Sequence, residues 1–177
     1  MPRRTQRVPV SEMTEKPRGA PPEEYVLKTC APADLTDAEI EECVSLVSDG
    51  GAVPRRFAEP GLRNARVLAV VRQGAVIVAV GAIKRVRNDY AARRAKLSGF
   101  SFPSSMRELG YVARHPAHRG HGFAPRIVEV LVSKHAGPLW ATTDSAGMKD
   151  ALAKAAFKRK GKEWPGARGQ LSLWLKP

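Results

Sequence analysis

Apolar and polar residues alternate along the 177-residue chain with two different periodicities. Some segments alternate, or are rich in β-branched residues, over five to ten positions, which is typical of strands. This pattern predicts strands over 24–30, 65–85, 106–114, 137–143 and 169–176. Within 65–85, Gln73-Gly74 predicts a turn, so the segment is interpreted as a hairpin of two strands.

Other segments place apolar residues three and four positions apart, as the buried face of a helix requires. They predict helices over 34–51, 54–63, 120–135 and 146–159. In 34–51, acids crowd the first turns and Gly50-Gly51 follows the last apolar residue, as expected at the two ends of a helix. Residues 86–105 are interpreted as an insertion that carries a short helix and a loop.

The predicted order, β-α-α-β-β-insertion-β-α-β-α-β, indicates a mixed α/β fold. The strand over 106–114, the helix over 120–135 and the next strand form a right-handed βαβ candidate with parallel strands. No apolar run approaches the roughly 18 residues of a membrane span. We expect one domain over 23–177, preceded by a flexible basic arm over 1–22. Cys30 and Cys43 do not suggest a disulfide framework, and the expected location is cytoplasmic.

The formal net charge is +13, and it is unevenly distributed. Residues 23–53 contain eight acids and one lysine, whereas residues 54–98 contain eleven Lys or Arg and two acids. Such a surface attracts nucleic acids and also small phosphorylated ligands, so charge alone does not choose between them. The cations of the insertion fit either a solvated helical face or one lip of an acceptor site; they are Arg85, Arg87, Arg93, Arg94 and Lys96.

The segment VARHPAHRGHGFAPRIVEVLVSKH, residues 112–135, carries the clearest candidate chemistry. A strand ending at Arg114, a turn with Pro116 and a helix beginning near Gly120 would offer unpaired backbone N–H groups at the positive end of a helix dipole. Gly120 and Gly122 leave room for close approach, and Arg119 adds a cation. The arrangement predicts a cradle for phosphate or pyrophosphate.

His115, His118 and His121 recur every third residue in the same segment. We expect their rings not to converge, and the segment has no Cys or acidic ligand, so no metal site is predicted. They are interpreted as turn histidines beside the anion site, where His118 or His121 can touch phosphate.

Arg119, Gly122 and Ala124 match the pattern R-x-x-G-x-G/A, placed between a strand and a helix. In this motif and in its order of elements, the chain resembles the GCN5-related N-acetyltransferases, the GNAT family, over roughly residues 24–176. The resemblance implies a mixed sheet with a splayed central strand pair and flanking helices. It also implies an acyl-CoA donor, most naturally acetyl-CoA, and a primary amine acceptor that attacks the acyl group directly.

The resemblance assigns the pyrophosphate of the donor to the backbone of six residues, Arg119, Gly120, His121, Gly122, Phe123 and Ala124. The pantetheine arm would lie along the strand edge formed by Tyr111, Val112, Ala113 and Arg114. The N–H of Val112 or Ala113 would polarise the acyl carbonyl.

Glu108, on the same strand, is the candidate general base, with an edge-strand ion pair as the alternative interpretation. Strand alternation places the Tyr111 side chain on the opposite face from Glu108, where it is expected to pack. The family often places a tyrosine, as acid for the leaving thiolate, at the position held here by Leu152, and a glycine where Ala156 stands. No tyrosine lies in 141–177. The acid could be Tyr90, which is also the candidate substrate-site residue, or Ser145, or water.

Two functions remain open from the sequence. The first is an acyl-CoA-dependent N-acyltransferase with a small-molecule or protein amine as acceptor. The alternative is a nucleic-acid-associated protein of this fold, which modifies a nucleic-acid-linked amine or binds CoA without turnover. A homodimer is possible, because the strand over 169–176 could pair within the chain or across two copies. No membrane partner is expected.

Overall fold

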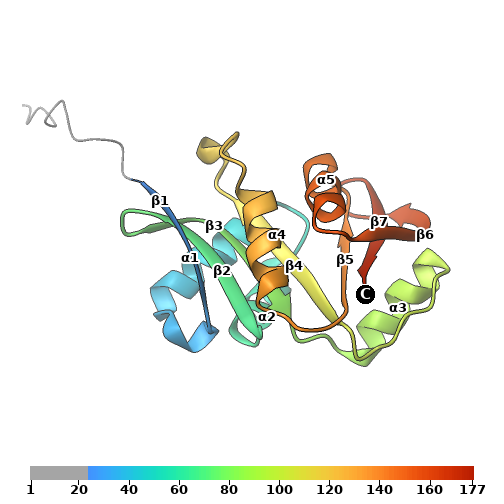
Figure 1. The fold of residues 1–177 in the computed structure, drawn as a ribbon. Coiled ribbons are helices and arrows are strands. Elements are labelled where there is room, and N and C mark those ends of the chain that lie inside the picture. The colour runs from blue at the N-terminus through green and yellow to red at the C-terminus, as the bar shows by residue number, and fades with distance from the viewer. Residues whose placement is uncertain (1–23) are drawn as a thin grey trace, which may run out of the picture.

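The computed structural model describes residues 24–177, so the arm predicted over 1–22 lies outside the described residues. These residues form a seven-stranded sheet in the order β1-β2-β3-β4-β5-β7-β6 (Figure 1). The strands are β1 (Tyr25–Cys30), β2 (Val67–Gln73), β3 (Val76–Lys84), β4 (Arg107–Arg114), β5 (Leu139–Thr143), β6 (Lys158–Pro165) and β7 (Gln170–Lys176). The mixed α/β plan predicted from the sequence is confirmed.

Five α-helices and two short 3₁₀ turns connect the described strands. They are η1 (Pro32–Asp34), α1 (Asp37–Asp49), α2 (Arg55–Arg63), α3 (Asn88–Ser98), η2 (Pro116–His118), α4 (Phe123–Ser133) and α5 (Ala146–Lys154). The helices lie where the sequence predicts them, with shorter ends, and α3 is the predicted helix of the insertion. No helix within residues 24–177 combines the length and the apolar run needed to cross a bilayer.

The sheet consists of two antiparallel halves, β1 to β4 and β5-β7-β6, joined by one parallel pair. That pair, β4 with β5, is short: Arg107 lies opposite Leu139 and Glu108 opposite Trp140, and the pairing ends there. The predicted parallel βαβ unit and the predicted splaying of the central strands are therefore both confirmed. Beyond Glu108, no strand of residues 24–177 is paired with β4 on the β5 side.

Helices cover both faces of the sheet. Leu139 and Trp140 are consecutive in β5 and point to opposite faces, as strand geometry requires. Leu139 belongs to the core formed with α4 and α5, whereas Trp140 packs in a separate cluster with α3. Helices α1 and α2 cover the β2–β3 half through their own buried cluster. Figure 1 shows α4 in front of the sheet and α1 behind it.

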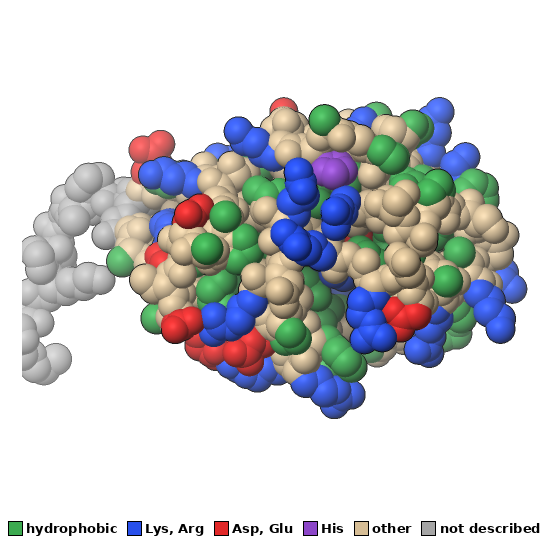
Figure 2. Space-filling model, turned by 90° about the horizontal axis from the view of Figure 1, so that it is seen from below, with side chains coloured by type: hydrophobic (Ala, Val, Ile, Leu, Met, Phe, Trp, Pro, Cys, Tyr) green, Lys and Arg blue, Asp and Glu red, His purple; other side chains and the backbone are tan. Residues whose placement is uncertain are grey.

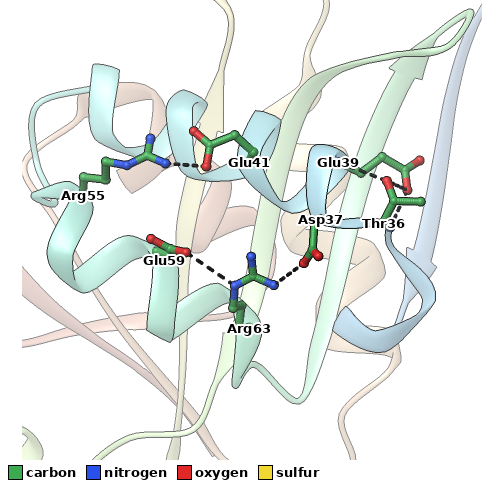
Figure 3. A network of polar contacts seen from close by, with 7 residues as sticks. All are labelled: Thr36, Asp37, Glu39, Glu41, Arg55, Glu59 and Arg63. Atoms are coloured by element: carbon green, nitrogen blue, oxygen red, sulfur yellow. Dashed lines mark hydrogen bonds and ion pairs between the residues drawn. The ribbon is translucent and has the colours of Figure 1, made fainter.

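Polar contacts fix α1 and α2 to each other (Figure 3). Thr36 caps α1 by accepting from the N–H of Glu39, whose carboxylate accepts from the N–H of Thr36 in return. Arg63, in the last turn of α2, lies 2.8 Å from Asp37 and 3.6 Å from Glu59, and Arg55 pairs with Glu41. The acid-rich segment noted in the sequence thus holds the basic helix that follows it.

The predicted helix over 146–159 is wrong in its last turn, and strand β6 was not predicted. Helix α5 ends at Lys154, Ala156 takes a left-handed backbone conformation with φ 66°, and β6 begins at Lys158. The sequence of β6, KRKGKEWP, has no apolar alternation, because it is the edge strand of the sheet and exposes most of its side chains. Its pairing with β7, and not a hydrophobic pattern of its own, makes it a strand.

Candidate active site

The predicted anion cradle lies at the N-terminus of α4. The helix begins at Phe123, three residues later than expected, because Gly122 is its N-cap in a left-handed conformation with φ 65°. Gly120 is also left-handed, with φ 82°, and both glycines face open space. Within the described chain, no backbone N–H from Arg119 to Ala124 has a hydrogen-bond acceptor. This row of free donors fits a pyrophosphate.

The histidines beside the cradle are fixed by β1. The hydroxyl of Tyr25 lies 2.8 Å from His118 Nδ1 and 3.4 Å from His121 Nε2. His115 accepts from the N–H of Ala117 and contacts the ring of His118. Tyr25 thus gathers two of the three histidine rings, those of His118 and His121. Among residues 24–177, no cluster of three His, Cys, Asp or Glu is arranged to hold a metal ion.

Strand β4 contains a β-bulge that begins three residues beyond its last pair with β5. Val80 lies opposite Ala113 and Ala82 opposite Gly110, so Tyr111 and Val112 together face the single residue between Val80 and Ala82. Tyr111 takes a φ of 54°, which is uncommon for a residue with a side chain. A bulge twists and bends its strand, which accounts for the divergence of β4 from β5.

The bulge also corrects the predicted orientation of Tyr111. The extra residue shifts by one position the alternation of side chains between the two faces of the sheet. Tyr111 therefore lies on the same face as Glu108 and packs with α1 and α2. The ring fits against Gly61 of α2, where an added Cβ would lie 2.0 Å from the Tyr111 hydroxyl oxygen. That hydroxyl donates to the carbonyl of Phe57 at 3.5 Å. The prediction that the Tyr111 side chain packs is confirmed.

Glu108 is buried, 3% exposed, and faces Lys84 of β3 directly across the strand pair. Lys84 Nζ lies 2.6 Å from Glu108 Oε2. Burial acts to lower the pKa of Lys84, but the Glu108 carboxylate, with Tyr90 and Tyr111, outweighs this effect, so the pKa is raised. Glu108 therefore has a partner that is cationic at neutral pH, so the ion pair of the alternative interpretation is present, on a central strand and not an edge strand.

Two tyrosines lie around this ion pair. Lys84 Nζ lies 4.4 Å from the ring centroid of Tyr111 and 5.3 Å from that of Tyr90. Arg94 donates to the Tyr90 hydroxyl at 3.1 Å, within α3. Burial raises the pKa of Tyr111, so its hydroxyl is protonated at neutral pH. The insertion thus brings Tyr90 to the candidate base, as its assignment to the substrate site requires.

The end of α5 and the turn that follows it contain the two positions aligned from the sequence. Ala156 has the positive φ that glycine adopts most easily, and Leu152, at the position where the family often has tyrosine, is fully buried. Ser145 is the N-cap of α5 and accepts from the N–H of Met148.

Arg168, between β6 and β7, connects the two halves of the sheet. It donates to both carboxylate oxygens of Asp144, which follows β5, at 2.6 and 3.2 Å. The same guanidinium donates at 2.6 Å to the carbonyl of Gly50, which follows α1. The segment after α1 and the loop between β6 and β7 are thus held together.

Sequence reasoning missed Lys84, Tyr25 and Arg168. Lys84 could have been found, because a lysine ending the apolar strand VIVAVGAIK lies in the hairpin partner of the strand carrying Glu108. Tyr25 and Arg168 act through contacts with residues 93 and 118 positions away, for which the sequence holds no local signal.

Comparison of this structure with solved structures finds extensive similarity at low sequence identity. An acyl-CoA N-acyltransferase from Pseudomonas aeruginosa superimposes with a TM-score of 0.62 at 12% identity, over 87% of this chain and 100% of that one. A GNAT-family acetyltransferase from Streptococcus agalactiae gives 0.58 at 15% identity, over 85% and 94%. The chain has the GNAT fold.

A third structure with this fold is the putative acetyltransferase YncA from Salmonella typhimurium, solved with its cofactor acetyl-CoA. It gives a TM-score of 0.59 at 16% identity, over 86% of this chain and 92% of that one. Searches with the sequence alone find no matching family model and no matching curated protein. The GNAT fold predicted from the sequence is thus confirmed by structure, at identities where sequence comparison fails.

Proposed function

We propose that the protein is an acyl-CoA-dependent N-acyltransferase that uses acetyl-CoA and a primary amine acceptor. The observation that carries this proposal is the row of free N–H donors over Arg119–Ala124, next to the unpaired edge of β4. The donors would hold the pyrophosphate, and the backbone of Tyr111–Arg114 would hold the pantetheine arm as an added strand does. Arg119, exposed at the mouth, adds charge.

Acetyl-CoA supplies an activated thioester carbonyl, so the remaining tasks of the protein are orientation and proton transfer. The N–H of Val112 or Ala113, at the bulge, would donate to the acyl oxygen. Glu108 accepts the proton that the attacking amine loses. Lys84 holds the Glu108 carboxylate in place.

The chain's own candidates for the proton that the leaving thiolate gains are Tyr90 and Ser145. Tyr90 lies beside the Lys84–Glu108 pair, and Ser145 begins α5 at the end of β5. Leu152 supplies no proton, so the acid differs from the one that the family often uses.

Leu152 favours a second candidate function, a protein that binds acyl-CoA without turnover. Thiol release from acetyl-CoA over a library of primary amines separates the two. A catalyst releases CoA with at least one amine, and Glu108→Gln then lowers kcat by about 10²-fold or more. If no amine supports release although acetyl-CoA binds, the second function stands.

Binding itself is tested by thermal unfolding with acetyl-CoA. At about 100 times its dissociation constant, a ligand adds about 2.7 kcal/mol of stability. Gly122→Glu puts a carboxylate into the cradle and is expected to abolish the shift in Tm. Ala92→Glu adds the same charge to an exposed position of α3 and should retain it. Absence of any shift in the unsubstituted protein would overturn the proposal.

A further inference from the structure

A row of cations lies at the end of the sheet away from the cradle. The strand directions bring the starts of β2, β4 and β5 together with the ends of β3 and β7 at this end. Arg107 is paired with Leu139, and Leu139 with Lys176, so these strand ends are neighbours. We call the cations and the histidine here the basal edge: Arg66, Arg85, Arg107, Lys134, His135 and Lys176.

Figure 2 looks onto this end and shows Lys and Arg side chains gathered beside a histidine near its middle. No cation of the basal edge forms an ion pair within residues 24–177. Glu108, which follows Arg107, is already paired with Lys84. The positive charge of the edge is therefore uncompensated.

The pKa of His135 is affected by this positive charge. Its pKa is lowered by partial burial and, beyond that, by Arg66 and Arg107, which oppose a further positive charge. The imidazole is thus neutral at pH 7, and the edge is a row of arginines and lysines around a neutral ring. An anion supplied from outside the chain would relieve the repulsion among them.

The composition of the edge favours a nucleic acid over a protein partner. The large hydrophobic side chains exposed in the described chain are Val26, Phe57 and Val76, and none belongs to the edge. Protein interfaces are anchored by buried apolar and aromatic side chains, and unpaired bases are held by stacking on aromatic rings. A surface that has cations, but neither exposed apolar anchors nor aromatic rings, is suited to the phosphates of a duplex.

The dimensions also fit. With strands about 4.8 Å apart, the edge extends over about 19 Å from β2 to β7. A duplex carries one charge per about 1.7 Å of axis, so this length presents more phosphates than the edge has cations. We propose that the basal edge binds the phosphate backbone of double-helical nucleic acid.

This surface is separate from the cofactor cradle of the proposed function, although Arg85 and Arg107 are next in sequence to Lys84 and Glu108. The cradle is at the N-terminus of α4, whereas Lys134 and His135 follow its C-terminus, about 16 Å away for a helix of 11 residues. The edge also differs from the outer face of α3, where Arg93 and Lys96 are exposed. The proposal therefore does not depend on acyl transfer.

The test measures anisotropy of a labelled RNA duplex of about 16 base pairs, with the full chain, between about 50 and 200 mM salt. Arg66→Glu/Lys134→Glu is expected to weaken binding at least tenfold. It should also reduce the slope of log affinity against log salt by about 1.8, because each lost phosphate contact contributes about 0.9. The matched control, Arg93→Glu/Lys96→Glu, makes the same change in net charge on α3 and should stay within threefold of the unsubstituted protein.

Three outcomes would overturn the proposal. In the first, the α3 pair loses as much affinity as the edge pair, or more. In the second, both pairs bind like the unsubstituted protein, which would assign binding to other residues. In the third, polyglutamate binds as tightly as the duplex, which would point to an acidic protein partner. The Tm of the edge pair without ligand confirms that it is folded, and its Tm shift with acetyl-CoA separates this result from the proposed function.

Discussion

The buried ion pair between Lys84 and Glu108 affects both the stability of the fold and the position of the candidate base. Taking a lysine and a carboxylate out of water is costly, and a close pair recovers much of that cost. The same pair fixes the position of the candidate base at the last position where β4 is paired with β5. At the scale of single residues, stability alone does not require this ion pair, because two hydrophobic side chains could take its place. Its role in the candidate site is therefore the better reason for it.

Removing one partner of this pair leaves the other charge uncompensated. Glu108→Leu is expected to lower the free energy of unfolding by about 3–5 kcal/mol, as for other broken buried pairs. Lys84→Met/Glu108→Leu, in which both charges are gone, should recover most of that loss. Denaturation by urea measures both, and a double variant as unstable as the single one would contradict the expectation.

The pair also predicts how stability depends on pH. Because the pKa of Lys84 is raised in the folded protein above its ordinary value of 10.5, its stabilising contribution is present below that pH and is lost as pH rises further. The free energy of unfolding should therefore fall more steeply above about pH 10.5 in the unsubstituted protein than in Lys84→Met/Glu108→Leu. Urea titrations at pH 9 to 11.5 compare the slopes, and equal slopes would exclude the contribution of Lys84.

Ala156 offers a second prediction for a single residue. A side chain at φ 66° costs about 1–2 kcal/mol, which glycine avoids. Ala156→Gly is therefore expected to stabilise the protein by up to about 1 kcal/mol once the greater freedom of glycine in the unfolded chain is subtracted. Ala153→Gly, inside α5, should instead destabilise it by about 0.5–1 kcal/mol. Thermal and urea unfolding compare the two, which should change in opposite directions.

At the scale of elements, the sequence predicted the position of nearly every helix and strand but not the bulge in β4. The hydrophobic rhythm of 106–114 is that of a regular strand, and nothing in it shows that Tyr111 and Val112 share one position opposite β3. The bulge follows from pairing between strands, which is a tertiary property. The face of Tyr111 was mispredicted for that reason, and β6 was missed for a similar one, since it is defined by its partner β7.

The start of α1 carries a prediction at this scale. Thr36→Ala removes a side-chain acceptor from the first turn and is expected to cost about 0.5–2 kcal/mol of stability. Thr36→Ser keeps the acceptor and should lose much less. Because α1 and α2 are connected through Asp37 and Arg63, hydrogen exchange should show that the loss of protection spreads from α1 to α2. Protection lost only in α1 would show that the two helices unfold independently.

At the scale of the whole molecule, Arg168 connects segments from both halves of the sheet. Arg168→Ala removes two contacts to Asp144 and one to the carbonyl of Gly50. Since the guanidinium side chain is 44% exposed, we expect a loss of only about 1 kcal/mol in global stability. The larger effect should be local, as faster hydrogen exchange near Gly50 and Asp144. Arg168→Lys cannot reproduce the paired contact and should show a similar local change. Unchanged exchange in both variants would contradict this.

The sequence predicted the anion cradle better than the rest of the site. The cradle is made by a contiguous segment, Arg119–Ala124, whose glycines and helix start are visible in the sequence. The surroundings of Glu108 are contributed by Lys84 and Tyr90 from two other elements, and the basal edge by the ends of five strands. Such groupings depend on strand order and direction, which follow from packing of the whole chain.

The lysine-rich composition of β6 affects whether the sheets of two copies of this protein can pair edge to edge. Strand β7 is hydrogen-bonded on both sides within the chain, so it is not available to a second copy in this structure. One of the two border strands of the sheet is β6, which exposes Lys158, Arg159 and Lys162 and is interrupted by Gly161 in a left-handed conformation. Two copies of this border would repel each other and could not align their amides. Growth of the sheet by pairing β6 with β6 of another copy is therefore opposed.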